Sequence, residues 1–125
     1  MAKRASKENK DQLLLTIVNG IEEVKGQDIV VLDLLSVPHA MADYFVICHG
    51  SSSTQVEAIS RSIEDETRKN LGERPGHVEG ARNSKWILMD YFNIVVHIFD
   101  QPSRQFYGLE ELWADGKVLD LKARA

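Results

Sequence analysis

The segment 86–99 constrains the fold more than any other part of the sequence. Two apolar runs within it flank the dipeptide Phe92-Asn93. Asn tolerates the left-handed backbone conformation that a two-residue hairpin turn requires. The pattern therefore predicts a β-hairpin. Its predicted opposite pairs are Trp86 with Phe99, Ile87 with Ile98, Leu88 with His97, Met89 with Val96, Asp90 with Val95 and Tyr91 with Ile94.

The predicted hairpin has two unlike faces, because side chains alternate across a strand. One face is almost purely apolar and consists of Ile87, Met89, Tyr91, Ile94, Val96 and Ile98. The other mixes large aromatic side chains with a carboxylate and an imidazole, and consists of Trp86, Leu88, Asp90, Val95, His97 and Phe99. A core does not need this mixture, whereas a binding surface does. We expect the first face in the core and the second to bind a partner.

The charge balance disfavours a broad nucleic-acid-binding surface. The chain of 125 residues has 19 acidic and 15 basic residues and a net charge of −4. Such a chain meets a basic protein more readily than bare nucleic acid, so we expect little or no direct nucleic-acid contact. The length fits one domain with a proper core.

Cysteine content and hydropathy indicate a cytoplasmic protein. Cys48 is the single cysteine, which excludes an internal disulfide and suits a reducing compartment. No apolar run approaches the ~20 residues that a membrane helix needs. The basic residues of 1–10 are not followed by the apolar core of a signal peptide, so we expect a flexible N-terminus there.

The first half of the chain predicts helix, strand and strand. Helical spacing of apolar residues predicts a helix over 11–25, and Gly26 ends it. Runs rich in β-branched residues predict strands at 28–34 and 43–49. The connection between these strands is too short for a crossover helix.

A second helix follows the Ser-rich stretch after these strands. Either of two capping boxes fits its start, Ser52 with Gln55 or Thr54 with Glu57, and residues 70–72 end it.

Past that helix, the segment 77–80 predicts a short strand in which Gly80 permits a bend or bulge. After the hairpin, a short helical segment starts at 101, with Pro tolerated in its first turn. The order of elements predicts an α/β fold with a mixed sheet of about five strands and helices packed on it. We assign 1–10 to a flexible N-terminus, 11–114 to one domain and 115–125 to a loosely attached C-terminal tail.

The identity and spacing of the residues argue against most catalytic interpretations. Cys48 and His49 are neighbours in a predicted strand and point to opposite faces, so they cannot form a nucleophile–base dyad. The four histidines lack the close pairing of a metal motif, so we predict no metal site and no cofactor.

One enzyme alternative stays open, a small nucleotide-binding or nucleotidyl-transfer enzyme. Gly50-Ser51 lies at a strand-to-helix junction, where backbone N–H groups can hold a phosphate. Asp33 and Asp90 would then supply the paired carboxylates. No Asp-x-Asp pair follows Gly50, and a Ser-rich stretch before a helix is more often simply a cap.

Several ordered blocks resemble one known family. They are Asp28-Ile-Val-Val-Leu-Asp33, Asp43-Tyr44-Phe45-Val-Ile, Gly50-x-Ser52, Glu79-Gly80, Trp86-Ile-Leu-x-Asp90-Tyr91, Val95-Val-His97-Ile-Phe99 and Arg104-x-Phe-Tyr107-x-Leu-Glu110-x-Leu-Trp113. These blocks resemble the ribosomal silencing factors, also called Iojap-like proteins, over about residues 11–114. The sequence departs from that family at Phe92-Asn93, where Gly-Asp is usual, which leaves the turn type open.

The resemblance implies a nucleotidyltransferase-like α/β fold without catalytic residues. It also implies binding to the large ribosomal subunit through universal large-subunit ribosomal protein number fourteen, which blocks subunit association and represses translation when nutrients are limiting. Homodimers off the ribosome are common in the family.

The hairpin and the family blocks together give the predicted partner-binding residues. They are Trp86, Leu88, Asp90, Tyr91, His97, Phe99, Tyr107 and Glu110. Trp86 and Phe99 would serve as apolar anchors, and Asp90 would pair with a basic residue of the partner. The alternative is that the terminal segment covers Trp86 and Phe99, with Trp113 packed on them.

Overall fold

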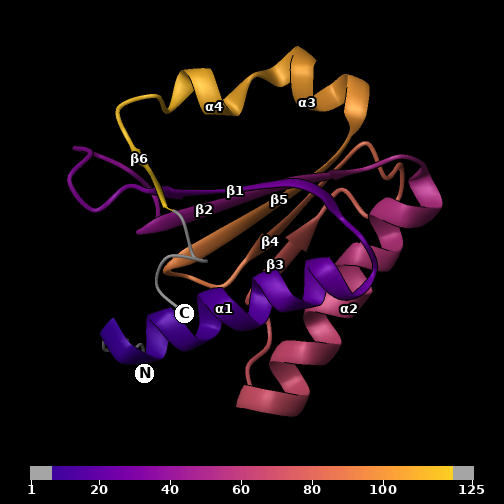
Figure 1. The fold of residues 1–125 in the computed structure, drawn as a ribbon, viewed down its shortest axis with the longest axis horizontal. Helices are drawn as coiled ribbons and strands as arrows, with labels where there is room; N and C mark the ends of the chain where they lie inside the picture. Colours follow the sequence, from indigo (N-terminus) through magenta and orange to yellow (C-terminus); the bar gives the residue numbers. More distant parts are fainter. Residues whose placement is uncertain (1–6, 120–125) are drawn as a thin grey trace.

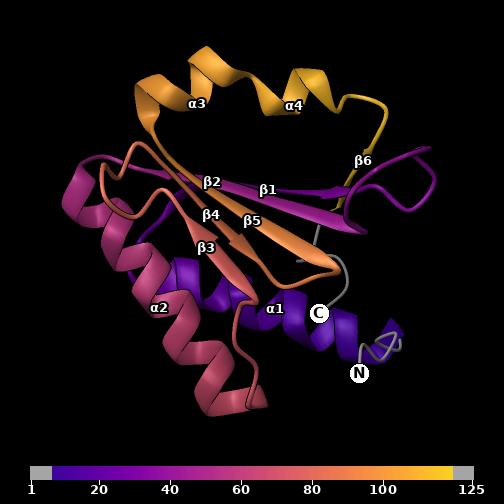
Figure 2. The ribbon, with the colours of Figure 1, turned by 180° about the vertical axis from the view of Figure 1, so that it is seen from behind.

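The computed structural model describes residues 7–119, which form one six-stranded mixed sheet between two helical layers. In chain order the elements are α1 (Lys7–Glu23), β1 (Gln27–Asp33), β2 (Tyr44–Gly50), α2 (Ser53–Leu71), β3 (His77–Glu79), β4 (Trp86–Asp90), β5 (Ile94–Asp100), α3 (Gln101–Tyr107), α4 (Leu109–Leu112) and β6 (Lys117–Leu119). The strand order is β3-β4-β5-β2-β1-β6; β2 and β5 are parallel, and the other neighbours are antiparallel. α1 and α2 lie on one face of the sheet, and α3 and α4 lie on the other (Figures 1 and 2).

The predicted hairpin is confirmed as β4 and β5. Every strand pair from Trp86–Phe99 to Asp90–Val95 has the predicted register. Next to the turn, the N–H of Tyr91 donates a hydrogen bond to the carbonyl of Ile94 at 2.9 Å.

The turn of the hairpin differs from the prediction. Phe92, and not Asn93, takes the left-handed conformation, with φ 73°. Asp90 Oδ1 accepts a hydrogen bond from the Phe92 N–H at 2.8 Å. The carbonyl of Asn93 accepts hydrogen bonds from the N–H groups of Asp43 and Tyr44, at 2.8 and 3.1 Å. Asn93 is thereby fixed where β2 begins, so the positive φ falls on the residue before it.

The main core lies between the sheet and the layer of α1 and α2. The apolar face of the hairpin is buried there, as predicted. α1 and α2 also contribute through fully buried side chains: Leu14, Ile17, Ile21, Val56, Ile59 and Ile63. Of the two capping boxes, the structure uses Ser52, whose side chain accepts a hydrogen bond from the Gln55 N–H at 3.1 Å.

A second, smaller core lies on the opposite face of the sheet, under α3 and α4. Leu109 of α4 packs there with Leu32, Phe45 and Phe99, and Trp113 packs against the cluster from its rim. The second face of the hairpin is therefore not a fully open surface, because Val95, His97 and Phe99 are buried in this core. The alternative that the terminal segment covers part of the face holds for Phe99.

The sheet gains a sixth strand from the segment predicted to be a loose tail. β6 pairs antiparallel with β1, so that Lys117 faces Asp33 and Leu119 faces Val31. The sequence did not predict this strand because three residues carry too short a pattern. At the other end, α1 begins at Lys7, within the stretch predicted to be flexible. The remaining residues of both predicted end segments, 1–6 and 120–125, lie outside the described residues.

Among residues 7–119, no helix is both long enough and apolar enough to cross a membrane.

Candidate binding surface

The helical layer of α3 and α4 leaves the β3–β4 side of its sheet face partly uncovered. Residues paired across antiparallel strands point to the same face, so His77 lies beside Asp90, and Glu79 lies beside Leu88. Trp86 shares this face, two residues before Leu88 on β4. We call these five residues the open face. His77 and Glu79 are exposed, and the three β4 residues are half-buried.

Aromatic stacking joins the open face to α3. The ring of Trp86 lies 4.6 Å from the ring of Tyr107 and 5.0 Å from that of Phe99, measured between centroids. Tyr107 is 47% exposed, and its neighbour Phe106 is 81% exposed. Large apolar groups with a polar edge are typical of protein-binding surfaces.

His97 orients the indole of Trp86 from below. The Trp86 Nε1–H donates a hydrogen bond to His97 Nδ1 at 3.1 Å. Because the indole can only donate, Nδ1 is the acceptor and the ring proton lies on Nε2. Burial lowers the pKa of His97 to about 4, so the ring is neutral at pH 7. Its buried Nε2 has no hydrogen-bond partner in the described part of the chain.

The predicted partner-binding residues thus divide into exposed and buried groups. Trp86, Leu88, Asp90 and Tyr107 reach the surface on or beside the open face. The side chains of Tyr91, His97 and Phe99 are buried and were predicted to touch a partner; in this structure His97 and Phe99 support the surface from beneath.

Tyr91 lies on the other face of the sheet from the open face, in the core under α1 and α2. Its hydroxyl lies 2.9 Å from Thr67 Oγ1, a buried hydrogen bond with α2. Burial raises the pKa of Tyr91 to about 12. The residue follows β4 at the turn and belongs to the apolar face of the hairpin, as the alternation predicts.

Sequence reasoning missed several exposed residues near the open face. Phe106 precedes Tyr107, and Phe92, at 74% exposure, occupies the hairpin turn. His77 and Glu79 join the face through the β3–β4 register, and His77 Nε2 lies 3.1 Å from Glu79 Oε2. Phe92 could have been found from the sequence, because a large apolar residue is unusual at a predicted turn. The contribution of β3 depends on a strand pairing that was not predicted.

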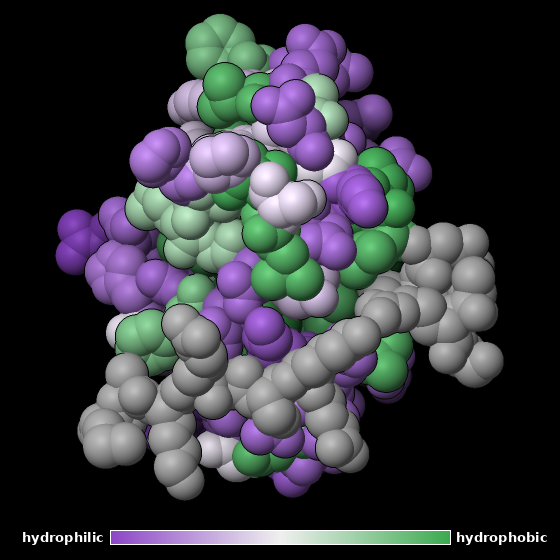
Figure 3. All heavy atoms as spheres, turned by 90° about the vertical axis from the view of Figure 1, so that its left-hand side faces the viewer, coloured by the Kyte–Doolittle hydropathy of each residue, from purple (hydrophilic) through white to green (hydrophobic). Residues whose placement is uncertain are grey.

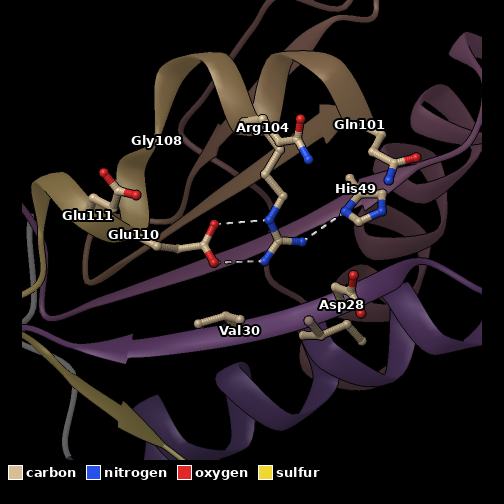
Figure 4. A pocket seen from close by; sticks show the side chains of 10 residues that line it. Asp28, Val30, His49, Gln101, Arg104, Gly108, Glu110 and Glu111 are labelled. Carbon is tan, nitrogen blue, oxygen red and sulfur yellow. Dashed lines mark hydrogen bonds and ion pairs between the residues drawn. The ribbon is translucent and has the colours of Figure 1, made fainter.

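Arg104 fixes the α3–α4 segment to the sheet (Figure 4). Its Nε and Nη2 donate to the two carboxylate oxygens of Glu110 at 3.0 and 3.2 Å. Its Nη1 lies 3.0 Å from His49 Nδ1 on β2 and 3.5 Å from the carbonyl of Gln27 on β1. Glu110, predicted to contact a partner, is therefore engaged within the chain, where it joins α4 to α3.

The same contact fixes the tautomer of His49. A guanidinium only donates, so His49 Nδ1 accepts and the ring proton lies on Nε2. Burial, followed by the charge of Arg104, lowers the pKa of His49, and Asp28 and Glu110 act in the opposite direction. A neutral imidazole beside the guanidinium is the favoured state.

A groove of about 720 Å³ lies between β1, β2 and the α3–α4 segment. His49 and Val30 contribute from the sheet, and Arg104 and Glu110 contribute from the helical segment (Figure 4). Asp28 and Glu111 complete the charged groups of its lining.

The residues of the enzyme alternative do not come together. Asp33 on β1 and Asp90 on β4 are separated by two strands, a spacing of about 14 Å. They also lie on opposite faces: Val31, two residues before Asp33, packs in the α1–α2 core, whereas Leu88, two residues before Asp90, packs on the α3–α4 side. Each carboxylate instead accepts a hydrogen bond from a nearby backbone N–H, that of Leu35 for Asp33 and that of Phe92 for Asp90.

Gly50-Ser51 lies at the other end of the sheet. Asp90 pairs with Val95, and Val95 pairs with Phe45, five residues before Gly50, or about 16 Å along the strand. The N–H and Oγ of Ser51 both donate to Gln55 Oε1, at 2.6 and 2.9 Å. The side chain of Gln55 therefore occupies the position at this junction that a phosphate would need.

Cys48 and His49 point to opposite faces of β2, as predicted. Cys48 is buried in the α1–α2 core, and burial raises the pKa of its thiol to about 12. A thiol with that pKa is a core group rather than a nucleophile.

The end of the molecule near α4, β6 and the loop after β1 shows a different surface. In Figure 3, hydrophobic and hydrophilic groups are interspersed at this end. Its elements carry four large hydrophobic residues that are more than half exposed: Leu35, Met41, Leu112 and Val118. Scattered exposed apolar residues are usual on protein surfaces and mark no site by themselves.

Comparisons with known proteins agree on one family. Residues 7–125 match the model of the family described as ribosomal silencing factor during starvation. The ribosomal silencing factor RsfS of Bacillus subtilis is 37% identical over 113 residues, which cover 90% of this chain and 94% of that protein. The chloroplastic protein Iojap of Zea mays is 29% identical over 110 residues, covering 86% of this chain and 46% of that protein. A crystal structure of a Bacillus halodurans protein superimposes with a TM-score of 0.76 at 31% identity, covering 87% of this chain and 97% of that one.

Proposed function

Because the chain belongs to the ribosomal silencing factor family, we propose that it binds the large ribosomal subunit and represses translation. In this proposal it contacts universal large-subunit ribosomal protein number fourteen and sterically blocks the small subunit from joining when nutrients are limiting. It acts in the cytoplasm without enzymatic activity, nucleotide or metal. Its fold is an α/β fold of nucleotidyltransferase type that has no catalytic residues.

The open face beside α3 is the observation that carries this proposal. It combines the half-buried Trp86 and Leu88 with the carboxylates of Glu79 and Asp90. An aromatic anchor next to acidic groups complements a partner surface that is apolar at its centre and basic at its rim. Tyr107 extends the apolar part onto α3 through its contact with Trp86.

A homodimer is the state that we propose for the protein off the ribosome. The same family resemblance supports it. An exposed aromatic surface that binds the ribosome would otherwise face solvent in the free protein.

Cosedimentation with isolated large and small ribosomal subunits tests the proposal. We expect binding to the large subunit alone. Trp86→Ala should weaken it by removing the apolar anchor, with an expected loss of about 2 kcal/mol for a central aromatic residue. Asp90→Lys should also weaken it, because like charges would then meet at a basic partner.

Two further variants make the result specific. Asp90→Asn keeps an oxygen that can accept the Phe92 N–H and removes only the charge, so it separates recognition from turn stability. Leu15→Ala removes an apolar side chain that is 45% exposed on the opposite layer and should bind normally. Thermal melts must show that each variant is folded. Unchanged binding by folded Trp86→Ala and Asp90→Lys would refute the assignment of the open face.

A further inference from the structure

The groove beside Arg104 carries more negative charge than its internal pairs neutralise. Its lining has three carboxylates, Asp28, Glu110 and Glu111, against the single guanidinium of Arg104. Glu110 is occupied by Arg104 through two hydrogen bonds. The side chains of Asp28 and Glu111 are exposed and form no ion pair or hydrogen bond with any described residue. Two carboxylates are thus free to pair with a cation.

The floor of the groove also offers a fixed hydrogen-bond donor. His49 is only 4% exposed, yet it is one of the residues that line the groove. Arg104 occupies its Nδ1, so the Nε2–H is the free polar group, and it has no partner among the described residues. A free ring N–H at the groove can donate to an acceptor such as a peptide carbonyl.

The edge of β1 next to the groove has no second neighbouring strand in the described part of the chain. Among residues 7–119, β6 pairs with β1 only from Val31 to Asp33, so residues 27–30 have a described neighbouring strand on one side alone. An uncovered edge gives an extended chain room to lie along it. The irregularity between Gln27 and Val30 excludes regular strand addition over the whole stretch.

We propose that this groove binds an arginine or lysine side chain carried by an extended segment of the partner protein. The cationic group pairs with Asp28 and Glu111, and the His49 Nε2–H donates to a main-chain carbonyl of the same segment. The groove lies on the β1–β2 side of α3, and the open face lies on its β4 side. In this proposal one partner therefore covers both surfaces. The identity of that partner rests on the proposed function, whereas the chemistry of the groove does not.

A peptide titration tests the groove without ribosomes. The probe is acetyl-Ala-Arg-Ala-amide, added to the full ¹⁵N-labelled chain, with the citrulline peptide as its uncharged control. We expect the arginine peptide alone to shift the amide signals of Ile29, Gly108 and Glu111. Equal shifts with citrulline, or no shifts with arginine, would overturn the proposal. Concentration-dependent shifts of these three groove signals without peptide would assign the groove to a second copy and would overturn the proposal as well.

A matched pair of variants then tests the two carboxylates. Asp28→Asn with Glu111→Gln removes two charges, and Asn tolerates the positive φ of 47° at position 28. Glu22→Gln with Glu23→Gln removes two exposed charges from α1 and serves as the control. We expect binding of the arginine peptide and of the large subunit to weaken about threefold to tenfold in the first variant only, the range for one or two exposed charge pairs.

The two arms separate the groove from the proposed function. If the unmodified chain does not bind the large subunit, the proposed function fails, and the peptide titration still decides the groove. If the chain binds the subunit and the groove variant binds it equally well, the groove proposal fails, and the open face stands.

Discussion

The indole N–H of Trp86 donates its hydrogen bond to a buried histidine, His97, at 3.1 Å. A half-buried aromatic group of the hairpin is therefore oriented by a buried polar group, which is only 4% exposed. Such a pair works only while the imidazole is neutral, because a protonated ring has no acceptor. The orientation of Trp86 on the open face thus depends on the protonation state of the buried His97.

Stability should fall in acid because of His97. Burial lowers its folded-state pKa from 6.5 to about 4, so the unfolded chain binds more protons between these values. The contribution is complete above pH 6.5 and is lost as the pH falls toward 4, by about 3 kcal/mol in total. Denaturant unfolding at pH 7.5 and 5 measures the part that is lost by pH 5, about 2 kcal/mol. His97→Gln should flatten the difference; an unchanged difference would mean that other groups cause it.

The Arg104–Glu110 pair should hold the α3–α4 segment in place. Arg104→Gln should destabilise the chain by about 1.5–3 kcal/mol, the usual value of hydrogen bonds to a charged group. It should also speed amide hydrogen exchange in residues 108–113 more than in α2. The double exchange Arg104→Glu with Glu110→Arg should recover part of the protection. No change in hydrogen exchange for Arg104→Gln would show that the aromatic contacts alone hold the α3–α4 segment on the sheet.

Gly80 should tolerate no side chain. Its φ is 85°, and a Cβ there would overlap the carbonyl oxygen of Trp86 where β4 begins. Gly80→Ala should cost about 3 kcal/mol or more, since both backbone and contact are strained. Gly72 is the matched comparison, because its φ is 64° and a Cβ would meet no described atom within 4 Å. Gly72→Ala should cost only about 1 kcal/mol. Equal melting temperatures for the two variants would contradict this reading.

Binding to the partner should need no metal and no nucleotide. The acidic pair that could hold a metal, Asp33 and Asp90, is divided between the two faces of the sheet. Dialysis against a chelator should leave binding to the purified ribosomal protein unchanged. Intact subunits themselves need Mg²⁺, so the isolated protein is the fair partner. An interaction that disappears with the chelator and returns with Mg²⁺ would be evidence against the account.

The sequence predicted the hairpin well because its information is local. Alternation fixes which residues share a face, and an apolar face admits only one register. The same reasoning predicted that Gly80 permits a bend or bulge and gave Ser52 as one of two possible helix caps. These features depend on residues within a few positions of one another.

Features that depend on distant pairing were not predictable in the same way. Lys117–Leu119 becomes a strand only because β1 offers an edge. Phe99 is buried only because Leu109 and Trp113 return over the sheet. Glu110 is engaged by Arg104 across the break at Gly108, so its carboxylate already has a partner within the chain. The sequence thus predicted which hairpin residues share a face, whereas their division into exposed and buried residues required the fold.

Order of addition to ribosomal subunits tests the central claim most directly. If the protein occupies the surface at which the subunits meet, the two binding events are mutually exclusive. Protein added before mixing should leave the subunits separate in a sucrose gradient. Protein added afterwards should act only as fast as assembled ribosomes dissociate, and Trp86→Ala should lose this activity in parallel with its affinity. Stable binding of the protein to complete, translating ribosomes would contradict the account.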